Sequence, residues 1–349
     1  MTLPTPRGRG TGSNPPNRFI PLYYDPDPDC PPDEAPAPTT QFFRDSVRTI
    51  ISTTDSPDVG FTHSVNPYRG CEHGCSYCYA RPYHEYLGLS AGLDFETKIF
   101  VKEDAPALLR KELSAKSWTP TPLSFSGVTD CYQPAERHYC VTRRCLEVCA
   151  EFRNPAGVIT KNALVTRDLD VLAAMAEWHG GEVFFSVTTL DADLAGTMEP
   201  RASRPAARLD AIAKCAAAGV PVGVMAAPMI PGLNDHELPA ILKAARDAGA
   251  TWAGFTLLRL PMAVGDVFDG WLAEHYPERR DKVMGRVRDA RGGRLNDSRF
   301  GHRMRGQGEL SETLRALFHT TAARLGYAKR LPPLSTAHFR RPGERTLFD

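Results

Sequence analysis

The sequence predicts an α/β protein built on a partial (β/α)6 barrel of the TIM type, with extensions at both ends. Two observations carry this prediction. From about residue 60, short apolar segments bounded by turn residues alternate with longer amphipathic segments, and 349 residues suffice for one such barrel with extensions. Strands that alternate with helices form a parallel sheet through right-handed crossovers. We therefore expect the chemistry at the carboxyl ends of the strands.

Six segments are expected to be strands of this sheet, because each is short, rich in apolar or β-branched residues and bounded by turn residues. They are HSVN (63–66), LSFSG (123–127), GVIT (157–160), VFFSVTT (183–189), VPVGVMAA (220–227) and WAGFTLL (252–258).

Four segments between these strands carry apolar residues at helical spacing, so we expect amphipathic helices there. Two of them end in Gly, which commonly terminates a helix. They are TRRCLEVCAEF (142–152), RDLDVLAAMAEW (167–178), ARLDAIAKCAAAG (207–219) and HELPAILKAARDAG (236–249).

We divide the chain into four parts. Residues 1–45 should form a disordered Pro-rich tail, because DPDPDCPPDEAPAP is acidic and poor in large apolar side chains; the alternative for its basic, Gly-rich beginning is an arm that covers a site. Residues 46–260 should form the barrel core. Residues 261–330 should form a basic, helical or irregular C-terminal extension that can act as a lid, and 331–349 an irregular tail.

The composition is that of a globular protein, with 42% hydrophobic and 24% charged residues and a formal net charge of +1. Such a small net charge gives no overall field that would attract nucleic acid or a membrane. The N-terminus lacks the apolar core of a secretory signal, and no apolar run approaches the roughly 18 residues that span a bilayer. We expect a cytoplasmic protein that does not contact membranes.

The segment NPYRGCEHGCSYCYARP (66–82) decides the chemistry. Its cysteines, Cys71, Cys75 and Cys78, have the spacing C-x3-C-x2-C, and three thiolates on one loop suit an iron–sulfur cluster. Three protein ligands leave one iron of a four-iron cluster open for a small chelating ligand. The alternative is structural zinc, with His73 or His84 as the fourth ligand.

The motif C-x3-C-x-aromatic-C, placed after the first strand of a β/α series, resembles that of the radical S-adenosylmethionine (SAM) superfamily. The resemblance implies a 4Fe-4S cluster bound by the three cysteines and SAM bound to the open iron. It implies reductive cleavage of SAM to methionine and a 5′-deoxyadenosyl radical that abstracts hydrogen from a substrate. Tyr77 matches the aromatic position near the adenine of SAM, unless it is an ordinary loop aromatic.

A longer part of the chain, roughly 45–325, is similar to the spore photoproduct lyase-like branch of this superfamily, closest to a poorly characterised bacterial group. The segments that carry this resemblance include TDCYQPAER, TKNALVTRDLDVL, SVTTLDADL, EPRASRPAARLDAI, APMIPGLND, LLRLP and RGGRLNDSRFGHRMRGQG. Several follow predicted strand ends, where the site of a barrel lies.

This resemblance implies SAM-binding roles for residues at three strand ends. Ser126, Gly127 and Thr129 follow the second strand, where the superfamily places groups that meet the SAM amino group. Lys161 follows the third strand and matches a lysine expected to pair with the SAM carboxylate; the alternative is a solvated surface lysine. Ser186 and Thr188, in the fourth strand, match positions near the ribose, although β-propensity alone can account for them.

Two residues are implied to be catalytic. Tyr79 matches a tyrosine near the cluster that assists hydrogen or electron transfer. Spore photoproduct lyase uses a cysteine near the second strand end as hydrogen donor, but SFSGVTD contains none here; Cys131 follows at once and is either the donor or a small core residue. This departure puts photoproduct repair in doubt. Arg201 either binds an anionic group or pairs with a carboxylate.

A second group of cysteines, Cys131, Cys140, Cys145 and Cys149, has two interpretations. It could hold an auxiliary cluster. Alternatively, Cys145 and Cys149 lie one helical turn apart on an apolar face, which favours core packing.

Three classes of function remain open. The first is a radical SAM enzyme that repairs or modifies nucleic acid, since residues 279–305 contain ten Lys/Arg and three acidic residues; the alternative for this stretch is a solvated helix. The second is a radical SAM enzyme that modifies a protein side chain or small metabolite. The third is a non-catalytic iron–sulfur or zinc module. We expect residues 294–308 to cover the barrel mouth, and a ferredoxin or flavodoxin to supply the electron.

Overall fold

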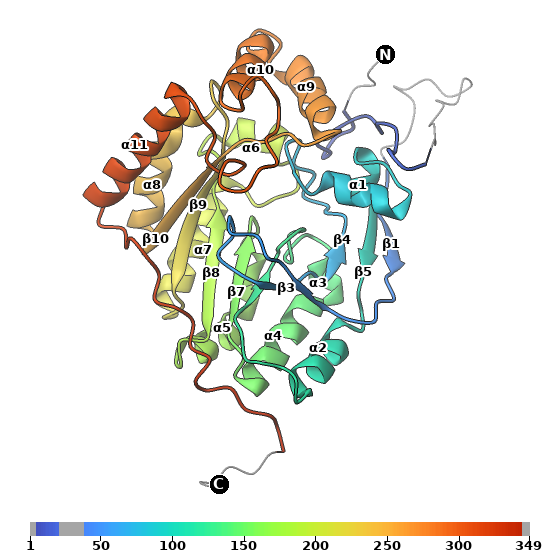
Figure 1. Ribbon diagram of the computed structural model, residues 1–349, viewed down its shortest axis with the longest axis vertical. Coiled ribbons are helices and arrows are strands. Elements are labelled where there is room, and N and C mark those ends of the chain that lie inside the picture. Colours follow the sequence, from blue (N-terminus) through green and yellow to red (C-terminus); the bar gives the residue numbers. More distant parts are fainter. Residues whose placement is uncertain (1–4, 21–37, 344–349) are drawn as a thin grey trace.

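The computed structural model, which describes residues 5–20 and 38–343, contains the predicted parallel sheet (Figure 1). Seven strands follow the order β10-β9-β8-β7-β6-β3-β2. Each neighbouring pair from β3 to β10 is parallel, and only β2 runs antiparallel, beside β3. The six parallel strands coincide with the six expected segments, so the barrel prediction is confirmed. The strands are β2 (Ile51–Thr53), β3 (His63–Val65), β6 (Leu123–Phe125), β7 (Ala156–Thr160), β8 (Gly181–Ser186), β9 (Val222–Met229) and β10 (Trp252–Leu257).

Helices cover the outer face of the sheet, and the four expected helices are among them (Figure 1). The last of the four shows why: Leu238, Ile241, Leu242 and Ala245 lie at helical spacing and are all buried against the sheet. The helices around the sheet are α2 (Ala105–Ser114), α4 (Val141–Phe152), α5 (Leu169–Ala176), α6 (Ala192–Met198), α7 (Pro205–Ala217) and α8 (Leu238–Asp247).

Side chains alternate across each strand, and this alternation leaves the inside of the barrel partly open. In β8, Val183 and Phe185 are completely buried in the core beneath the helices. Their neighbours Glu182 and Phe184 point to the other face and line a cavity. The sheet therefore supports both a continuous hydrophobic core outside and a hollow inside.

A small second sheet is formed by β1, which precedes β2, together with β4 and β5, which lie with two short helices between β3 and β6 in the sequence. The order of its strands is β1-β5-β4, with β1 parallel and β4 antiparallel to β5. The cysteine loop, residues 70–80, begins directly after the end of β4. These elements are β1 (Gln41–Arg44), β4 (Tyr68–Arg69), η1 (Arg81–Leu87), α1 (Leu93–Thr97) and β5 (Lys98–Val101).

We expect residues 1–45 to be a disordered tail, and the structure describes two parts of them, residues 5–20 and 38–45. Residues 5–20 contain no helix or strand but pack beside α1 (Figure 1), and Arg9, Thr11 and Asn17 are buried there. The end of the tail, from residue 41, forms β1. The acidic Pro-rich segment between them lies outside the described residues.

Beyond β10 the β/α alternation ends, and three helices follow. The helix α11 packs against α8 and β10, and the chain then runs without helix or strand along the lower end of the barrel as far as residue 343, where the described part ends (Figure 1). No helix in the described part of the chain has both the length and the apolar character needed to cross a membrane. The helices are α9 (Val264–His275), α10 (Arg280–Asp289) and α11 (Glu309–Arg324).

Candidate active site

A cavity of about 1440 Å³ lies inside the barrel and reaches the carboxyl ends of the strands. A cavity of this size exceeds what most small ligands need. It brings together ten of the residues that the sequence singles out, from segments more than one hundred residues apart. They are Cys71, Cys75, Tyr77, Cys78, Tyr79, Ser126, Gly127, Thr129, Lys161 and Ser186.

The cysteine loop, residues 70–80, turns twice through left-handed backbone conformations, at Gly70 (φ +76°) and Gly74 (φ +67°). A side chain at Gly74 would stand 2.6 Å from a carboxylate oxygen of Glu96, so the second turn requires glycine on steric grounds as well. The two turns place all three cysteines on the cavity wall.

The three thiols fit an iron–sulfur cluster. Burial, the charge of Asp130 and the neighbouring thiols raise the pKa of Cys71, and burial also raises that of Cys75. Two of the three neighbouring thiols are thus buried, and their thiolates would need positive charge, which iron would supply. Among the described residues no group of three His, Cys, Asp or Glu side chains converges on a single metal ion, whereas a cubane cluster binds each thiolate to a different iron.

Neither histidine that we considered as a zinc ligand is placed to serve as one. The Nδ1 atom of His73 lies 3.4 Å from Asp130, and its Nε2 atom lies 3.2 Å from the side-chain amide of Asn162. Burial lowers the pKa of His73 to about 4, although Asp130 opposes this, so the ring is neutral. His84 packs edge-on against Phe95 and does not line the cavity.

Asp130 fixes the end of β7 beside the cysteine loop. Its carboxylate accepts hydrogen bonds from the Thr160 hydroxyl (2.8 Å) and the Lys161 amide (2.7 Å). The Lys161 side chain lies in the cavity, with Nζ 5.8 Å from the centre of the Tyr77 ring. Lys161 is therefore a cationic group on the cavity wall, next to the aromatic residue of the cysteine motif.

Tyr77 is held from behind by a buried polar network. Its hydroxyl donates to Glu199, which also accepts from Thr188 (2.6 Å) and forms an ion pair with Arg208. Burial alone would raise the pKa of Glu199, but Arg208 and Lys161, with the two hydroxyls, lower it to about 2. Thr188 is completely buried and does not line the cavity, and its hydroxyl lies 3.3 Å from that of Tyr77.

Tyr79 stands at the cavity mouth. Its hydroxyl donates to the Gly127 carbonyl at 3.2 Å, and the guanidinium of Arg259 lies 4.7 Å from the centre of its ring. Ser126 adopts a left-handed backbone (φ +77°), which is unusual for a residue with a side chain and turns the chain sharply after β6.

The structure places Cys131 away from the cavity. The Ser126 hydroxyl accepts the Cys131 amide at 2.7 Å, and this turn directs Cys131 into the hydrophobic core, where its exposed fraction is 0%. Cys131 does not line the cavity. A hydrogen donor must reach the substrate, so this position favours the other role considered for Cys131, that of a small core residue.

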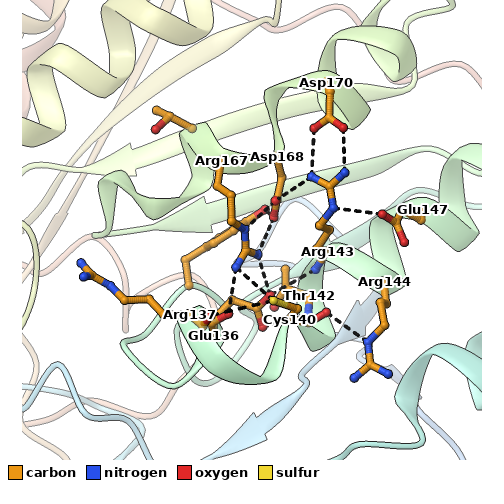
Figure 2. A network of polar contacts seen from close by, with 12 residues as sticks. Glu136, Arg137, Cys140, Thr142, Arg143, Arg144, Glu147, Arg167, Asp168 and Asp170 are labelled. Carbon is orange, nitrogen blue, oxygen red and sulfur yellow. Dashed lines mark hydrogen bonds and ion pairs between the residues drawn. The ribbon is translucent and has the colours of Figure 1, made fainter.

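The other cysteines of the second group, Cys140, Cys145 and Cys149, do not surround a common site for an auxiliary cluster. Cys145 and Cys149 are completely buried in the same core as Cys131. Cys140 instead lies in the turn before α4, where Arg167 approaches its sulfur at 3.4 Å within a network of arginines and carboxylates (Figure 2). This arrangement agrees with core packing and gives no support to an auxiliary cluster.

Arg201 pairs with Glu72 of the cysteine loop at 3.0 Å. Of the two roles considered for this residue, the structure therefore shows the ion pair with a carboxylate. Its backbone amide also donates to the His73 carbonyl at 3.3 Å, so the segment after α6 is attached to the cysteine loop through both side chain and backbone.

Part of the segment 294–308, which we expect to cover the barrel mouth, lines the cavity. Arg303 forms an ion pair with Asp58 at 2.7 Å and lines the cavity together with Phe300, Met304 and Arg305. Buried Arg291 anchors this segment to the end of β10, because it donates to the carbonyls of His302 and Arg303 and to those of Leu257 and Leu258. We call residues 294–308 the lid segment.

Several residues of the site have no counterpart in the sequence prediction. Asp130, Glu199 and Arg259 lie in TDCYQPAER, EPRASRPAARLDAI and LLRLP, segments that follow strand ends or lie close to them. Their position near strand ends indicates that they belong to the site. It does not identify their partners, Lys161, Tyr77 and Tyr79, which come from other strands and loops. Only the folded arrangement shows these pairings.

Comparison with known proteins identifies the family. The sequence pattern of the radical SAM superfamily matches residues 65–245, more than half of the chain. The chain belongs to the radical SAM superfamily. An uncharacterised protein of Mycobacterium tuberculosis is 37% identical over 220 residues, which cover 62% of this chain and 65% of that protein. This chain thus matches less than two thirds of the mycobacterial relative.

Two further proteins are similar to the chain, one in sequence and one in fold. An uncharacterised protein of Methanocaldococcus jannaschii is 28% identical over 188 residues, 54% of this chain and 67% of that protein. Spore photoproduct lyase complexed with dinucleoside spore photoproduct has a TM-score of 0.59 at 18% identity, covering 82% of this chain and 80% of that one. The expected likeness to spore photoproduct lyase is therefore confirmed for the fold.

Proposed function

We propose that this protein is a radical SAM enzyme in which Cys71, Cys75 and Cys78 bind a 4Fe-4S cluster. When bound, the cluster supplies the electron that cleaves SAM to methionine and a 5′-deoxyadenosyl radical, which abstracts hydrogen from the substrate. The observation that carries the proposal is the position of the three thiols on one wall of the barrel cavity.

The other residues of the cavity wall would hold and orient SAM. Lys161 offers a positive charge to the SAM carboxylate. Tyr77, fixed by Glu199, offers a rigid face near the adenine. Gly127, Thr129 and Ser186 add backbone and hydroxyl groups around the amino group and ribose, although the Thr129 hydroxyl already donates to the Tyr68 carbonyl at 2.8 Å. Tyr79, close to Cys78 in sequence, would assist hydrogen or electron transfer to the substrate.

For the substrate we propose a nucleic acid that carries a lesion or a base to be modified. Arg259, Arg303, Arg305 and Arg315 line the cavity and can meet phosphates. Tyr83 and Phe300 line it as well, and exposed aromatic rings can stack on an unpaired base. Spore photoproduct lyase, which has the same fold, was solved with a dinucleoside photoproduct.

Two other classes of substrate are also compatible with the cavity. A protein side chain or a small metabolite also fits a cavity of 1440 Å³, and the core position of Cys131 leaves repair of the photoproduct itself without the cysteine that the resemblance calls for. For the electron we propose a ferredoxin or flavodoxin as donor, because cleavage of SAM needs one electron at a time.

The first test is made on anaerobically reconstituted protein. Iron and sulfide are counted, the cluster is reduced with dithionite, SAM is added, and 5′-deoxyadenosine is measured. We expect about four irons per chain and formation of 5′-deoxyadenosine that stops in the Cys71→Ala, Cys75→Ala, Cys78→Ala triple variant.

The matched control is a Cys131→Ala, Cys145→Ala double variant, which removes two cysteines that do not line the cavity. It should retain the iron and the SAM cleavage. Binding of zinc in place of iron, or a fully loaded and reducible cluster that leaves SAM intact, would show that the protein is a binding module.

A further inference from the structure

The N-terminal segment 5–20, which we call the strap, crosses the back of the cysteine loop. The backbone amide of Gly10 donates to a carboxylate oxygen of Glu96 at 2.9 Å, and Arg9 donates to the Glu96 carbonyl at 3.0 Å. Both strap residues are buried, although the strap itself contains no helix or strand. A segment without secondary structure stays in place only where its polar groups find such partners.

Glu96 passes this attachment on to the cysteine loop. Its other carboxylate oxygen forms an ion pair with Arg81 at 2.6 Å, and both side chains have an exposed fraction of 0%. Arg81 in turn donates to the carbonyls of Gly74 (3.2 Å) and Cys75 (2.9 Å). One buried carboxylate therefore joins the strap to the backbone of two residues in the cysteine motif.

The strap also fits the loop sterically. A methyl group at Gly10 would overlap the carbonyl oxygen of Gly74, so only glycine allows this contact. Further along, the Ser13 carbonyl accepts the Leu93 amide at 3.0 Å, and the Asn17 side chain donates to the Glu85 and Leu89 carbonyls. The strap is thus attached to the loop, to α1 and to the end of η1.

We propose that Arg9, Gly10 and Glu96 are positioning residues for the cluster, and that they act by holding the backbone of the cysteine loop. Left-handed turns at Gly70 and Gly74 are conformations that a free loop readily leaves. With the strap in place, the loop presents its three thiols together before iron arrives. The inference rests on the proposed cluster but concerns the loop, so it can be tested without SAM chemistry.

The test compares full-length wild-type protein with Gly10→Ala and Arg9→Ala. Hydrogen exchange of the amides of residues 71–80 is measured in the iron-free protein, and release of iron to a chelator is measured in the reconstituted protein. We expect both rates to rise about ten-fold, because each variant removes buried hydrogen bonds or the contact that allows them. Arg9→Lys should restore part of the protection by keeping a donor near the Glu96 carbonyl.

Two matched controls keep the result specific. Arg7→Ala changes an exposed arginine of the same strap, and Gly270→Ala adds a methyl group in α9 where no atom lies within 4 Å; neither should alter either rate. Unchanged exchange of residues 71–80 in Gly10→Ala would overturn the proposal. A rise spread evenly over the barrel strands would overturn it too, because the strap would then support the whole fold. If the wild-type protein fails to cleave SAM, the proposed function is refuted, but the hydrogen-exchange measurement still tests the role of the strap.

Discussion

At the scale of single residues, buried charges lie where they join separate parts of the chain around the site. Glu199 and Arg208 form an ion pair whose exposed fractions are 0% and 1%, and Arg81 and Glu96 form another. Removing such charges from water costs several kcal/mol per ion, which their attraction only partly returns. We interpret both pairs as devices that fix position, since each also binds the backbone or a ligand-facing side chain.

Glu199→Gln should destabilise the protein strongly. The variant keeps the shape of the side chain but leaves Arg208 buried without its counter-charge, which costs about 3–5 kcal/mol. Urea unfolding of the iron-free protein measures the change, with exposed Glu278→Gln as the control. A loss as small as that of the control would mean that Glu199 does not carry the charge that we assign to it.

At the scale of elements, the segment after β6 connects the outer helices to the cysteine loop. Buried Glu136 accepts from the Thr142 amide (3.0 Å) and from Arg167 (2.9 Å), as Figure 2 shows. It also accepts from the Tyr68 hydroxyl, so it joins α4, the short helix η2 (Ala163–Asp168) and β4. Three residues earlier, the Gln133 side chain accepts the Glu72 amide at 2.9 Å. The arginine and carboxylate network at the outer surface thus holds one side of the cysteine loop, while the strap holds the other.

The lid segment should control the substrate and not the cleavage of SAM. Replacing both Arg303 and Arg305 by Ala removes the ion pair to Asp58 and two charges at the cavity mouth. We expect substrate turnover to fall about ten-fold or more, as for the loss of a charge-assisted contact. Formation of 5′-deoxyadenosine without substrate should continue at the wild-type rate.

Arg299→Ala is the control for this experiment, because Arg299 belongs to the same segment but is exposed and pairs with Asp297. It should leave both activities unchanged. An equal loss of substrate turnover and of uncoupled SAM cleavage in the double variant would refute the lid.

At the scale of the whole molecule, charge is unevenly distributed although the net charge is only +1. Several arginines of the basic stretch 279–305 are engaged within the fold: Arg280 pairs with Asp269, Arg299 with Asp297, and Arg291 binds backbone carbonyls. Among the arginines that line the cavity, Arg303 pairs with Asp58 in the same way, so Arg259, Arg305 and Arg315 are a better site for phosphates than the stretch as a whole.

Binding of a short single-stranded oligonucleotide should accordingly weaken with salt. Contacts with about three phosphates predict a log–log slope of about −2. Fluorescence anisotropy between 50 and 200 mM salt measures this slope, and Arg259→Ala should make it shallower. A slope near zero, or no binding at all, would favour the protein or small-metabolite substrate.

The sequence predicts the barrel well because each strand is a short apolar run between turn residues, a pattern that local physics determines. The sequence is a poor predictor of the position of residues whose contacts depend on the folded backbone. Cys131 follows a strand end, yet the left-handed turn at Ser126 breaks the alternation and directs it into the core. The strap contains few apolar residues, so composition predicts a disordered tail, whereas backbone amides and one glycine contact attach it.

The way in which Arg291 holds the lid segment bears on how this protein can evolve. In the described structure its guanidinium binds main-chain carbonyls, so these hydrogen bonds do not depend on the side chains at positions 302 and 303. Saturation mutagenesis should thus find Arg291 intolerant of replacement while positions 302 and 303 accept many residues without loss of folding. Selection can then vary the side chains at the cavity mouth and change substrate preference while the lid remains attached to the barrel.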